Sequence, residues 1–403
     1  MMSHHGVSEF VFAVAGSNIS SPTKASVQTH GGLQNIIMNM EALGAMKHGD
    51  YKRLEFLTFT RPKVTVDTDV LIEIAYTDTN PVDLQKLLGK GPGQPITNNE
   101  PFVPGFGGSG IVFETGKHAP MEWIGQRVCF IADPTRRGSY ATHIVVDYRC
   151  VALVPSGVSL RDAASIPVAG LTAFESLSKV GLAIATNSDR ENVEKEISSN
   201  VEKSLLIIGG AGGVGSWTIS LARAWHPKLK IFATASMDMQ QDWCRSLGAD
   251  EVIKHDEIER LPGGGQDGCF DAIICLTEPT SDLFSACAQV IRPYGLMCLV
   301  VSGKSIQSLD MSFFFFKSAT MSTQTVFSSI RTKFQHIIPA KELSVILELL
   351  CSGRVKAPIS PDLESGEVKE TFKDASSETG VLNSLTNTSG RRGKYVMKVY
   401  SVY

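Results

Sequence analysis

The middle of the chain alternates between short apolar runs and stretches in which apolar residues recur at helical spacing. The run Leu205–Ile208 leads into a glycine-rich segment, after which apolar residues recur every three or four positions at Val214, Trp217, Leu221 and Trp225. This spacing places them on one face of a helix. The pattern therefore predicts a buried strand, a tight turn and a helix.

The same rhythm continues toward residue 301. Further strands are predicted at 231–235, 251–253, 271–275 and 295–301, with helices at 240–247 and 281–291 between them. Gly248 suits the end of the first of these helices, because glycine adopts the left-handed conformation of a helix C-cap at little cost. Alternating strands and helices predict a doubly wound parallel sheet.

The region before this sheet has a different pattern. Apolar runs at 70–74, 110–114, 125–130 and 141–146 are short and are separated by segments rich in glycine and proline. Such punctuation is typical of a compact β domain. Short helices are predicted from Asp162 to Ser165 and after Gly170, a longer one over 340–351, and a closing strand over 394–399.

The bulk composition limits the classes of function. The chain has 403 residues, 43% of them hydrophobic, and a net charge of -3. This length predicts two domains, and the absence of a basic excess argues against nucleic acid as a partner. The eight cysteines form no C-x-x-C pair, and several lie in apolar runs, which favours buried thiols in a reducing compartment.

No apolar stretch reaches the roughly 18 residues that a membrane span requires, so we expect a soluble, cytoplasmic protein that does not bind membranes. Residues 1–38 are rich in Ser, Gly and His and nearly free of charge. They predict a disordered N-terminal extension rather than a targeting signal. The polar stretches 186–203 and 376–392 are read as exposed inserts.

The glycine-rich segment carries the clearest chemistry. Gly210, Gly212 and Gly215 have the spacing G-x-G-x-x-G directly between the predicted strand and helix, which is the context of a dinucleotide-binding fingerprint. The first glycine permits the tight turn, the second lets the backbone approach a pyrophosphate, and the third lets the helix pack closely. The helix N-terminus then offers free N–H groups to the phosphates.

Several further motifs follow one another along the chain. They are Asn80-Pro81-Val82-Asp83, Val103-Pro104-Gly105-Phe106-Gly107-Gly108-Ser109-Gly110, Ala169-Gly170-Leu171-Thr172-Ala173-Phe174-Glu175, Thr234-Ala235-Ser236, the run from Trp243 to Asp250 and Gly393-Lys394-Tyr395-Val396. With the fingerprint, they make the chain resemble the medium-chain dehydrogenase/reductase superfamily, in its quinone-oxidoreductase and zinc-type alcohol-dehydrogenase-like branch. The resemblance spans about residues 40 to 403.

The resemblance implies an α/β fold with two parts. A GroES-like, β-rich catalytic domain is expected over 39–167 and 320–403, and a Rossmann dinucleotide-binding domain with a doubly wound parallel sheet over 168–319. It also implies a homodimer formed through the edge of the Rossmann sheet.

A catalytic zinc is not expected, although zinc-type relatives bind one. Where those relatives carry a ligand cysteine, this chain has Asn80, and where they carry Gly-His-Glu it has Gly105-Phe106-Gly107. The third ligand region, at 166–169, has no cysteine. Because zinc needs three or four Cys, His or carboxylate ligands, no metal residue is predicted.

The catalytic candidates are Asn80, Asp83 and Tyr140. Asn80 stands at the position of a metal ligand in the relatives and would donate a hydrogen bond to a developing oxyanion. The alternative is an Asx-turn before Pro81. Asp83 would orient Asn80 or a water, or else begin a helix. Tyr140 resembles a family position near cofactor and substrate, although an aromatic residue beside a strand is also a common core residue.

The cofactor-binding candidates are Thr172, Gly210, Gly212, Gly213, Val214, Gly215 and Ser236. The resemblance places the Thr172 hydroxyl near the nicotinamide, whereas a bond back to a helix carbonyl is the alternative. The second Rossmann strand ends in Thr234-Ala235-Ser236 without the carboxylate that usually holds the ribose of NAD. NADPH is therefore favoured over NADH, although Met237 and Asp238 follow where the family often has an arginine.

These residues predict a zinc-independent reductase that transfers hydride from NADPH to a small-molecule quinone or α,β-unsaturated carbonyl. An alcohol dehydrogenase is less favoured, because without zinc nothing evident stabilises an alkoxide. An alternative of another class is an NADP(H)-binding sensor or scaffold protein with little catalysis.

Overall fold

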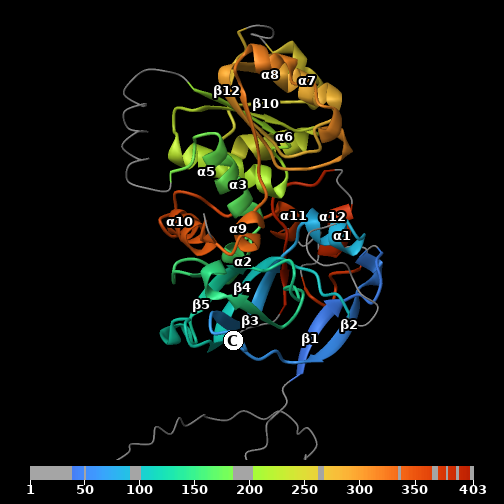
Figure 1. Ribbon diagram of the computed structural model, residues 1–403, viewed down its shortest axis with the longest axis vertical. Coiled ribbons are helices and arrows are strands. Elements are labelled where there is room, and N and C mark those ends of the chain that lie inside the picture. The colour runs from blue at the N-terminus through green and yellow to red at the C-terminus, as the bar shows by residue number, and fades with distance from the viewer. Residues whose placement is uncertain are drawn as a thin grey trace, which may run out of the picture. The chain divides into compact units, whose positions relative to one another are not determined.

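The computed structural model describes residues 39–49, 51–90, 101–184, 203–261, 267–334, 337–364, 371–377, 380–386 and 390–399 (Figure 1). The predicted disordered extension at 1–38 and nearly all of the predicted insert at 186–203 fall outside these residues. Most of the predicted insert at 376–392 is described. It contains helix α12 (Val381–Thr386), in which Val381 and Leu382 are buried, so this stretch is not exposed throughout as expected. No helix among the described residues is long and apolar enough to cross a membrane.

A six-stranded parallel sheet contains the strand that leads into the glycine fingerprint. Its order is β10-β9-β8-β11-β12-β13, and every neighbouring pair is parallel. The order reverses between β8 and β11, as in a doubly wound sheet, which confirms the predicted fold class. The strands are β8 (Ser204–Ile208), β9 (Lys230–Thr234), β10 (Glu251–Ile253), β11 (Phe270–Cys275), β12 (Ile291–Leu299) and β13 (Thr320–Thr323).

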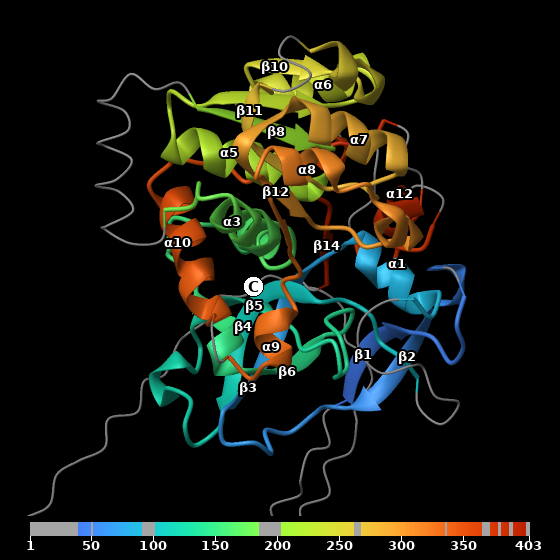
Figure 2. The same cartoon turned by 45° about the horizontal axis from the view of Figure 1, so that its top comes forward.

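Helices cover both faces of this sheet, so most side chains of its two central strands are apolar and buried (Figure 2). In β8, Leu205 and Ile207 join the core that contains Trp217, whereas Leu206 and Ile208 join the core that contains Phe284. The first face is covered by α3 (Ala169–Lys179), α5 (Gly213–Trp225) and α6 (Asp238–Ser246), and the second by α7 (Ser281–Val290) and α8 (Ser312–Phe316).

An antiparallel sheet forms the other part of the fold. Its order is β14-β3-β4-β5-β7, and β6 also pairs with β3. The last strand comes from the chain's end, so Val396 pairs with Asp78 and brings the C-terminal segment beside the end of β3. The strands are β3 (Asp69–Asp78), β4 (Gly107–Thr115), β5 (Arg127–Ile131), β6 (His143–Asp147), β7 (Val151–Leu153) and β14 (Val396–Lys398).

The remaining elements surround this second sheet. β1 (Asn39–Gly44) and β2 (Glu55–Thr60) pair as a separate antiparallel ribbon. Helix α10 contacts β5 and β7, and α2 contacts β3, β4 and β5. The other helices are α1 (Pro81–Leu87), α2 (Leu160–Ala164), α9 (Ser328–Arg331), α10 (Pro339–Cys351), α11 (Pro361–Glu364) and α12 (Val381–Thr386).

The structure differs from the sequence-based expectation at one domain limit. The parallel sheet extends beyond residue 319, because β13 pairs with β12 at its edge. This strand reads Thr-Met-Ser-Thr and is partly exposed, so it lacks the apolar run that indicates a buried strand. The limits of the predicted domains otherwise remain predictions.

Candidate active site

The glycine fingerprint forms the turn between β8 and α5. Gly209 has φ 84°, in the left-handed region, and α5 begins at Gly213 after the N-cap Gly212. A Cβ on Gly215 would lie 2.4 Å from the carbonyl oxygen of Gly209, so only glycine permits this close packing. The predicted residues Gly210, Gly212, Gly213, Val214 and Gly215 therefore lie together at this turn.

The helix N-terminus at this turn has no side-chain cap, since Gly212 makes no capping hydrogen bond. The first N–H groups of a helix lack partners within the helix and attract anions. At Gly212 itself, an added Cβ would meet only the Gly209 carbonyl oxygen, at an ordinary 3.6 Å. The turn therefore has the backbone and the open space that a dinucleotide pyrophosphate requires.

The end of β9 lies beside this turn. Thr234 is fully buried, and its Oγ1 accepts a 2.9 Å hydrogen bond from the Gly209 backbone N–H. Ser236 follows on the same edge of the sheet and is exposed, as is Met237. The strand end itself carries no carboxylate, which leaves room for a 2′-phosphate at Ser236, but the carboxylate of Asp238 follows two residues later at the start of α6.

The C-terminal segment connects the glycine turn to the antiparallel sheet. The Gly393 N–H donates to the Ala211 carbonyl at 2.9 Å, and the Gln240 side chain donates to the Arg391 carbonyl at 2.7 Å. A Cβ on Gly213 would lie 3.2 Å from the Lys394 Cδ. The Lys394 side chain thus runs close to the start of α5.

The catalytic candidates Asn80, Asp83 and Tyr140 form one buried cluster. Asn80 precedes α1, Asp83 lies in its first turn, and Tyr140 lies before β6. One oxygen of Asp83 accepts hydrogen bonds from the Asn80 backbone N–H at 2.7 Å and from the Tyr140 hydroxyl at 2.9 Å. The hydrogen bond from the Asn80 N–H is the contact expected of Asp83 at a helix start. The hydrogen bond from the hydroxyl links Asp83 to Tyr140.

Burial perturbs both titratable groups of this cluster. Desolvation, followed by the nearby charge of Asp78, raises the pKa of Asp83 from 3.8 to about 7. Hydrogen bonds from Asn80 and Tyr140 and the charge of Lys394 oppose this rise. Burial and the Asp83 charge raise the pKa of Tyr140 well above 10. Strongly shifted groups in one cluster mark a candidate active site.

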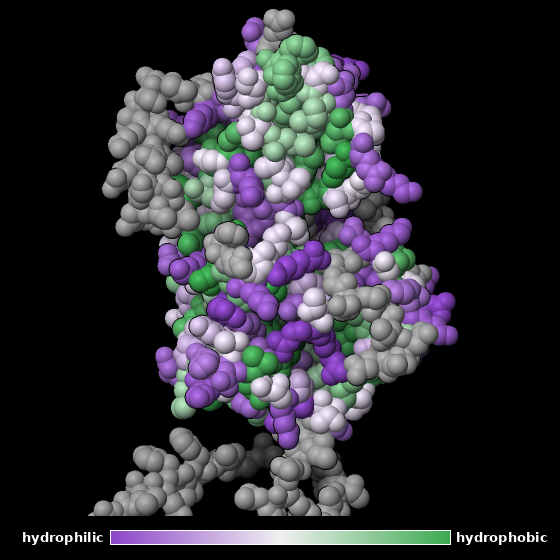
Figure 3. Space-filling view, in the orientation of Figure 1, coloured by the Kyte–Doolittle hydropathy of each residue, from purple (hydrophilic) through white to green (hydrophobic). Residues whose placement is uncertain are grey.

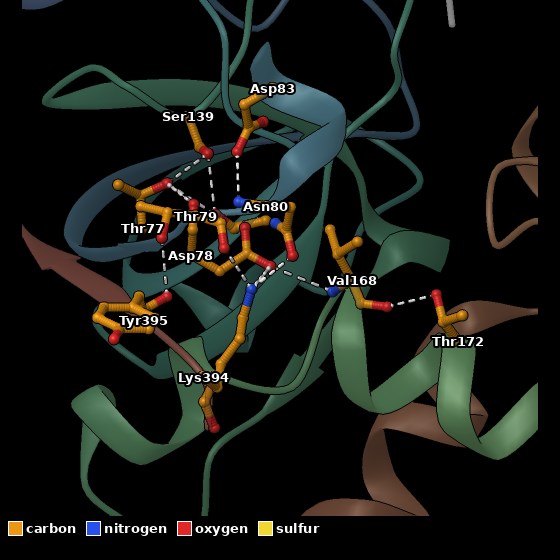
Figure 4. Close-up of polar contacts among 12 residues, drawn as sticks. Thr77, Asp78, Thr79, Asn80, Asp83, Ser139, Val168, Thr172, Lys394 and Tyr395 are labelled. Atoms are coloured by element: carbon orange, nitrogen blue, oxygen red, sulfur yellow. Dashed lines mark hydrogen bonds and ion pairs between the residues drawn. The ribbon is translucent and has the colours of Figure 1, made fainter. Parts of the chain in front are cut away.

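Sequence reasoning missed Asp78 and Lys394, which lie in contact with Asn80. The Lys394 Nζ donates to the Asn80 Oδ1 at 2.5 Å and lies 3.6 Å from Asp78 (Figure 4). Both charged side chains are almost fully buried. One sequence signal was available, since Asp78 ends a mostly apolar stretch from Val70, interrupted by Glu73 and Thr77, and a charge that is buried there needs a partner.

Thr172 lies in the first turn of α3. Its hydroxyl donates to the Val168 carbonyl at 2.6 Å, while the Val168 N–H donates to Asp78 at 3.2 Å (Figure 4). The bond to the helix carbonyl is the alternative considered for this residue. Because a hydroxyl also accepts hydrogen bonds, its role toward a cofactor stays a prediction.

The three regions that carry zinc ligands in the relatives converge here, but their donors do not fit zinc. Asn80 offers an amide, Phe106 stands at the histidine of Gly-His-Glu, and residues 166–169 carry no Cys, His or carboxylate side chain. The Lys394 ammonium lies beside Asn80. Within the part of the chain that the structure describes, no three His, Cys, Asp or Glu side chains form a metal-binding group. Zinc requires thiolate, imidazole or carboxylate ligands, so these side chains do not fit it.

Sequence comparisons agree with this architecture. Residues 66–156 match the family model of the alcohol dehydrogenase GroES-like domain, and residues 213–342 match that of the zinc-binding dehydrogenase. A zinc-type alcohol dehydrogenase-like protein of Staphylococcus aureus is 31% identical over 257 residues, covering 63% of this chain and 71% of the relative. An NADPH-dependent alkenal/one oxidoreductase of Arabidopsis thaliana is 33% identical over 220 residues, covering 53% and 51%.

Solved structures share the fold at lower identity. A putative zinc-dependent alcohol dehydrogenase of Rhizobium etli superposes with a TM-score of 0.71 at 24% identity, covering 91% of this chain and 100% of the other. A quinone oxidoreductase of Coxiella burnetii gives 0.69 at 22% identity, covering 90% and 100%. With the matching family models and the 31% identical relative, the chain belongs to the medium-chain dehydrogenase/reductase superfamily of pyridine-nucleotide-dependent oxidoreductases.

Proposed function

We propose that this protein is a zinc-independent reductase that uses NADPH to reduce an α,β-unsaturated carbonyl or a quinone. The observation that carries the proposal is the buried cluster of Asn80, Asp83 and Tyr140 beside the dinucleotide turn. The names of two relatives, a 2-methylene-furan-3-one reductase of Solanum lycopersicum and the alkenal/one oxidoreductase, support this substrate class.

The glycine turn and the start of α5 would hold the cofactor's pyrophosphate, and Ser236 would lie near its adenosine ribose. Bound NADPH supplies a hydride to the electron-poor carbon of the acceptor. The chain's own contribution is to hold the acceptor oxygen and to exclude water from it. Preorganised hydrogen-bond donors stabilise the charge that develops on such an oxygen.

Asn80 is the donor that we assign to this oxygen. Its Oδ1 already accepts from Lys394, and its Nδ2 is buried without a hydrogen-bond partner among the residues that the structure describes. A buried donor without a partner costs about 1–3 kcal/mol, which a bound carbonyl oxygen would recover. Tyr140 and Asp83 then form a hydrogen-bonded pair that would hold a proton next to Asn80, for the acceptor's final protonation.

The preference for NADPH rests on the end of β9. Ala235 stands near the usual position of the acidic residue, and Ser236 is exposed. A carboxylate there would repel a 2′-phosphate, and its absence favours NADPH over NADH.

The test is a stopped-flow comparison of NADPH and NADH oxidation with a naphthoquinone, a short 2-alkenal, a simple aldehyde and no acceptor, each with and without chelator. The proposal predicts NADPH oxidation with the quinone or the alkenal that chelator does not change. Cofactor oxidation with the simple aldehyde that chelator abolishes would favour an alcohol dehydrogenase. Tight NADPH binding without turnover of any acceptor would favour a sensor or scaffold protein.

A further inference from the structure

Lys394 is a buried lysine whose ammonium group meets three consecutive residues at the end of β3. Its Nζ donates to the Thr79 carbonyl at 2.8 Å and to the Asn80 Oδ1 at 2.5 Å, and it lies 3.6 Å from the Asp78 Oδ2. The side chains of Lys394 and Asp78 are 2% and 0% exposed. A buried charge needs a partner and hydrogen bonds, and Lys394 has both.

The ammonium group decides which way the Asn80 amide faces. A lysine only donates hydrogen bonds, so the amide atom that faces it must be the oxygen. The Nδ2 hydrogens therefore point elsewhere, and the Nδ2 has no partner among the described residues. In a site without Lys394, the amide would be free to turn its oxygen toward an acceptor oxygen and repel it.

The backbone around Lys394 is fixed on both sides. The Lys394 N–H donates to the Pro358 carbonyl at 2.7 Å, and the Ser360 N–H donates to the Lys394 carbonyl at 2.9 Å. The preceding Gly393 is bonded to Ala211 in the glycine turn. The ammonium group is thus held in place from the same segment that contacts the cofactor-binding turn.

The Asp78–Lys394 pair lies among the regions that carry zinc ligands in zinc-type relatives. Asp78 accepts from the Val168 N–H at 3.2 Å, and a Cβ on Gly107 would lie 3.0 Å from its Oδ1. The same Cβ would lie 2.6 Å from the Pro167 Cβ, so a side chain at position 107 would displace Pro167 and press against Asp78. In this chain a carboxylate–ammonium pair therefore lies among these regions.

We propose that Lys394, held by Asp78, is a positioning residue that takes the place of a metal and fixes Asn80 with its amide hydrogens available to the substrate oxygen. This inference rests on the proposed reductase function and deepens it. Lys394 acts through Asn80 and does not itself touch the substrate.

The test is a double-mutant cycle with Lys394→Met, Asn80→Ala and the double variant, read as kcat with the best acceptor of the panel. We expect Lys394→Met to lower kcat at least thirtyfold, with the Kd for NADPH, measured by fluorescence, changed less than threefold. In the Asn80→Ala background the same change should cost less than threefold more, because the residue that Lys394 positions is already gone.

Lys317→Met is the matched control. Lys317 is also buried, and its Nζ donates to three backbone carbonyls, those of Ala288, Gln289 and Ile291, in the other part of the fold. We expect this variant to lose stability in urea, as Lys394→Met does, but to keep the kcat of the wild type. Equal losses of kcat in both lysine variants would make the effect of Lys394→Met a general consequence of destabilisation.

Two results would overturn the proposal. The first is that the two substitutions act independently, so that kcat of the double variant falls by the product of the two single-variant factors. The other is a Lys394→Met protein with unchanged kcat and a Kd for NADPH raised tenfold, which would make the lysine a cofactor ligand. A wild-type protein inactive with every acceptor would refute the proposed function instead. In that case, the urea midpoints of the wild type, Lys394→Met, Asn80→Ala and the double variant would show whether Lys394 and Asn80 are coupled in stability. Additive changes in the midpoint would refute the contact itself.

Discussion

At the scale of single residues, Asp83 and Tyr140 form the hydrogen-bonded pair that we propose as the proton source. The tyrosine hydroxyl donates to the carboxylate at 2.9 Å, and this bond lowers the pKa of Asp83 from the value that burial alone would give. A carboxyl group with a pKa of about 7 changes charge near neutral pH. Activity should therefore depend on pH through this pair.

Tyr140→Phe tests that dependence. Removing the phenol removes a hydrogen bond to the charged carboxylate, so the pKa of Asp83 rises. We expect the inflection of kcat that lies near pH 7 in the wild type to move to higher pH, together with a fall in kcat of about tenfold to a hundredfold. The measurement is the pH profile of kcat at saturating NADPH. An inflection that stays in place, or moves to lower pH, would contradict the assignment.

At the scale of elements, two glycines of the β8–α5 turn have different roles, one in cofactor binding and the other in folding. A Cβ fits at Gly212, where its nearest neighbour is 3.6 Å away, but collides with the Gly209 carbonyl oxygen when placed at Gly215. Substitutions at these two positions therefore have different consequences, although both belong to one motif.

The glycine pair gives a matched prediction. Gly212→Ala should fold with the wild-type urea midpoint and bind NADPH at least tenfold more weakly, because the methyl group lies where the pyrophosphate approaches the backbone. Gly215→Ala should lose about 1–3 kcal/mol of stability through overpacking. Isothermal titration with NADPH and urea unfolding measure both. Normal NADPH affinity in Gly212→Ala would refute the binding site at this turn.

Two further elements meet through a pair of buried carboxyl groups. Glu175 of α3 lies beside Glu342 of α10, and the Gln324 side chain donates to Glu175. Burial raises the pKa of both glutamates, and the neighbouring carboxyl group raises that of Glu175 further. The folded protein therefore binds more protons here than the unfolded chain does, so stability falls as pH rises above the usual glutamate pKa of about 4.3.

Glu342→Gln should remove this penalty. We expect the variant to melt at a higher temperature than the wild type at pH 8 and to differ little from it at pH 5, where the carboxyl groups are protonated in the folded state. Glu348→Gln, an exposed position on the same helix, is the control and should change neither value. A Glu342→Gln protein that is less stable at pH 8 would show that the charged pair stabilises the fold.

At the scale of the whole molecule, no other described part of the chain covers one edge of the parallel sheet or a nearby aromatic surface. β13 is the last strand of its sheet, and α8, which precedes it, exposes Phe315 and Phe316 at 81% and 80%. Figure 3 shows hydrophobic surface over α7 and α8. Exposed edges and apolar patches of this kind are commonly covered by a partner.

We predict a homodimer that covers this surface. The wild type should have the mass of two chains in light scattering, and replacing both Phe315 and Phe316 by serine should shift it toward one chain. Met121→Ser, at an exposed apolar position in the other part of the fold, is the control and should leave the dimer intact. A monomeric wild type at micromolar concentration would contradict the prediction.

The sequence predicts the whole fold better than it predicts the site. Apolar runs locate the central strands of the parallel sheet, because these are buried on both faces, as Leu205 to Ile208 are. The edge strand β13 and the ribbon of β1 and β2 are partly exposed and lack that signal. The residues of the glycine turn are neighbours in the sequence, so the G-x-G-x-x-G spacing predicts the turn directly.

The active-site cluster is not local. Asn80 and Asp83 are neighbours in sequence, but Tyr140 and above all Lys394 reach them only through tertiary structure. A lysine in a closing strand carries no sign in the sequence that its ammonium group is buried against Asp78. Side-chain contacts across more than 300 positions depend on the pairing of β14 with β3.

The single-turnover rate of NADPH oxidation in Asn80→Ala tests the central claim most directly. With the wild type and the best acceptor as reference, and with Asn39→Ala, an exposed position in β1, as control, only Asn80→Ala should be slow. The account predicts a fall of about a hundredfold to a thousandfold, as for the loss of one oxyanion donor, with an unchanged Kd for NADPH and no effect of chelator on any of the three proteins. A wild-type rate in Asn80→Ala would contradict the account.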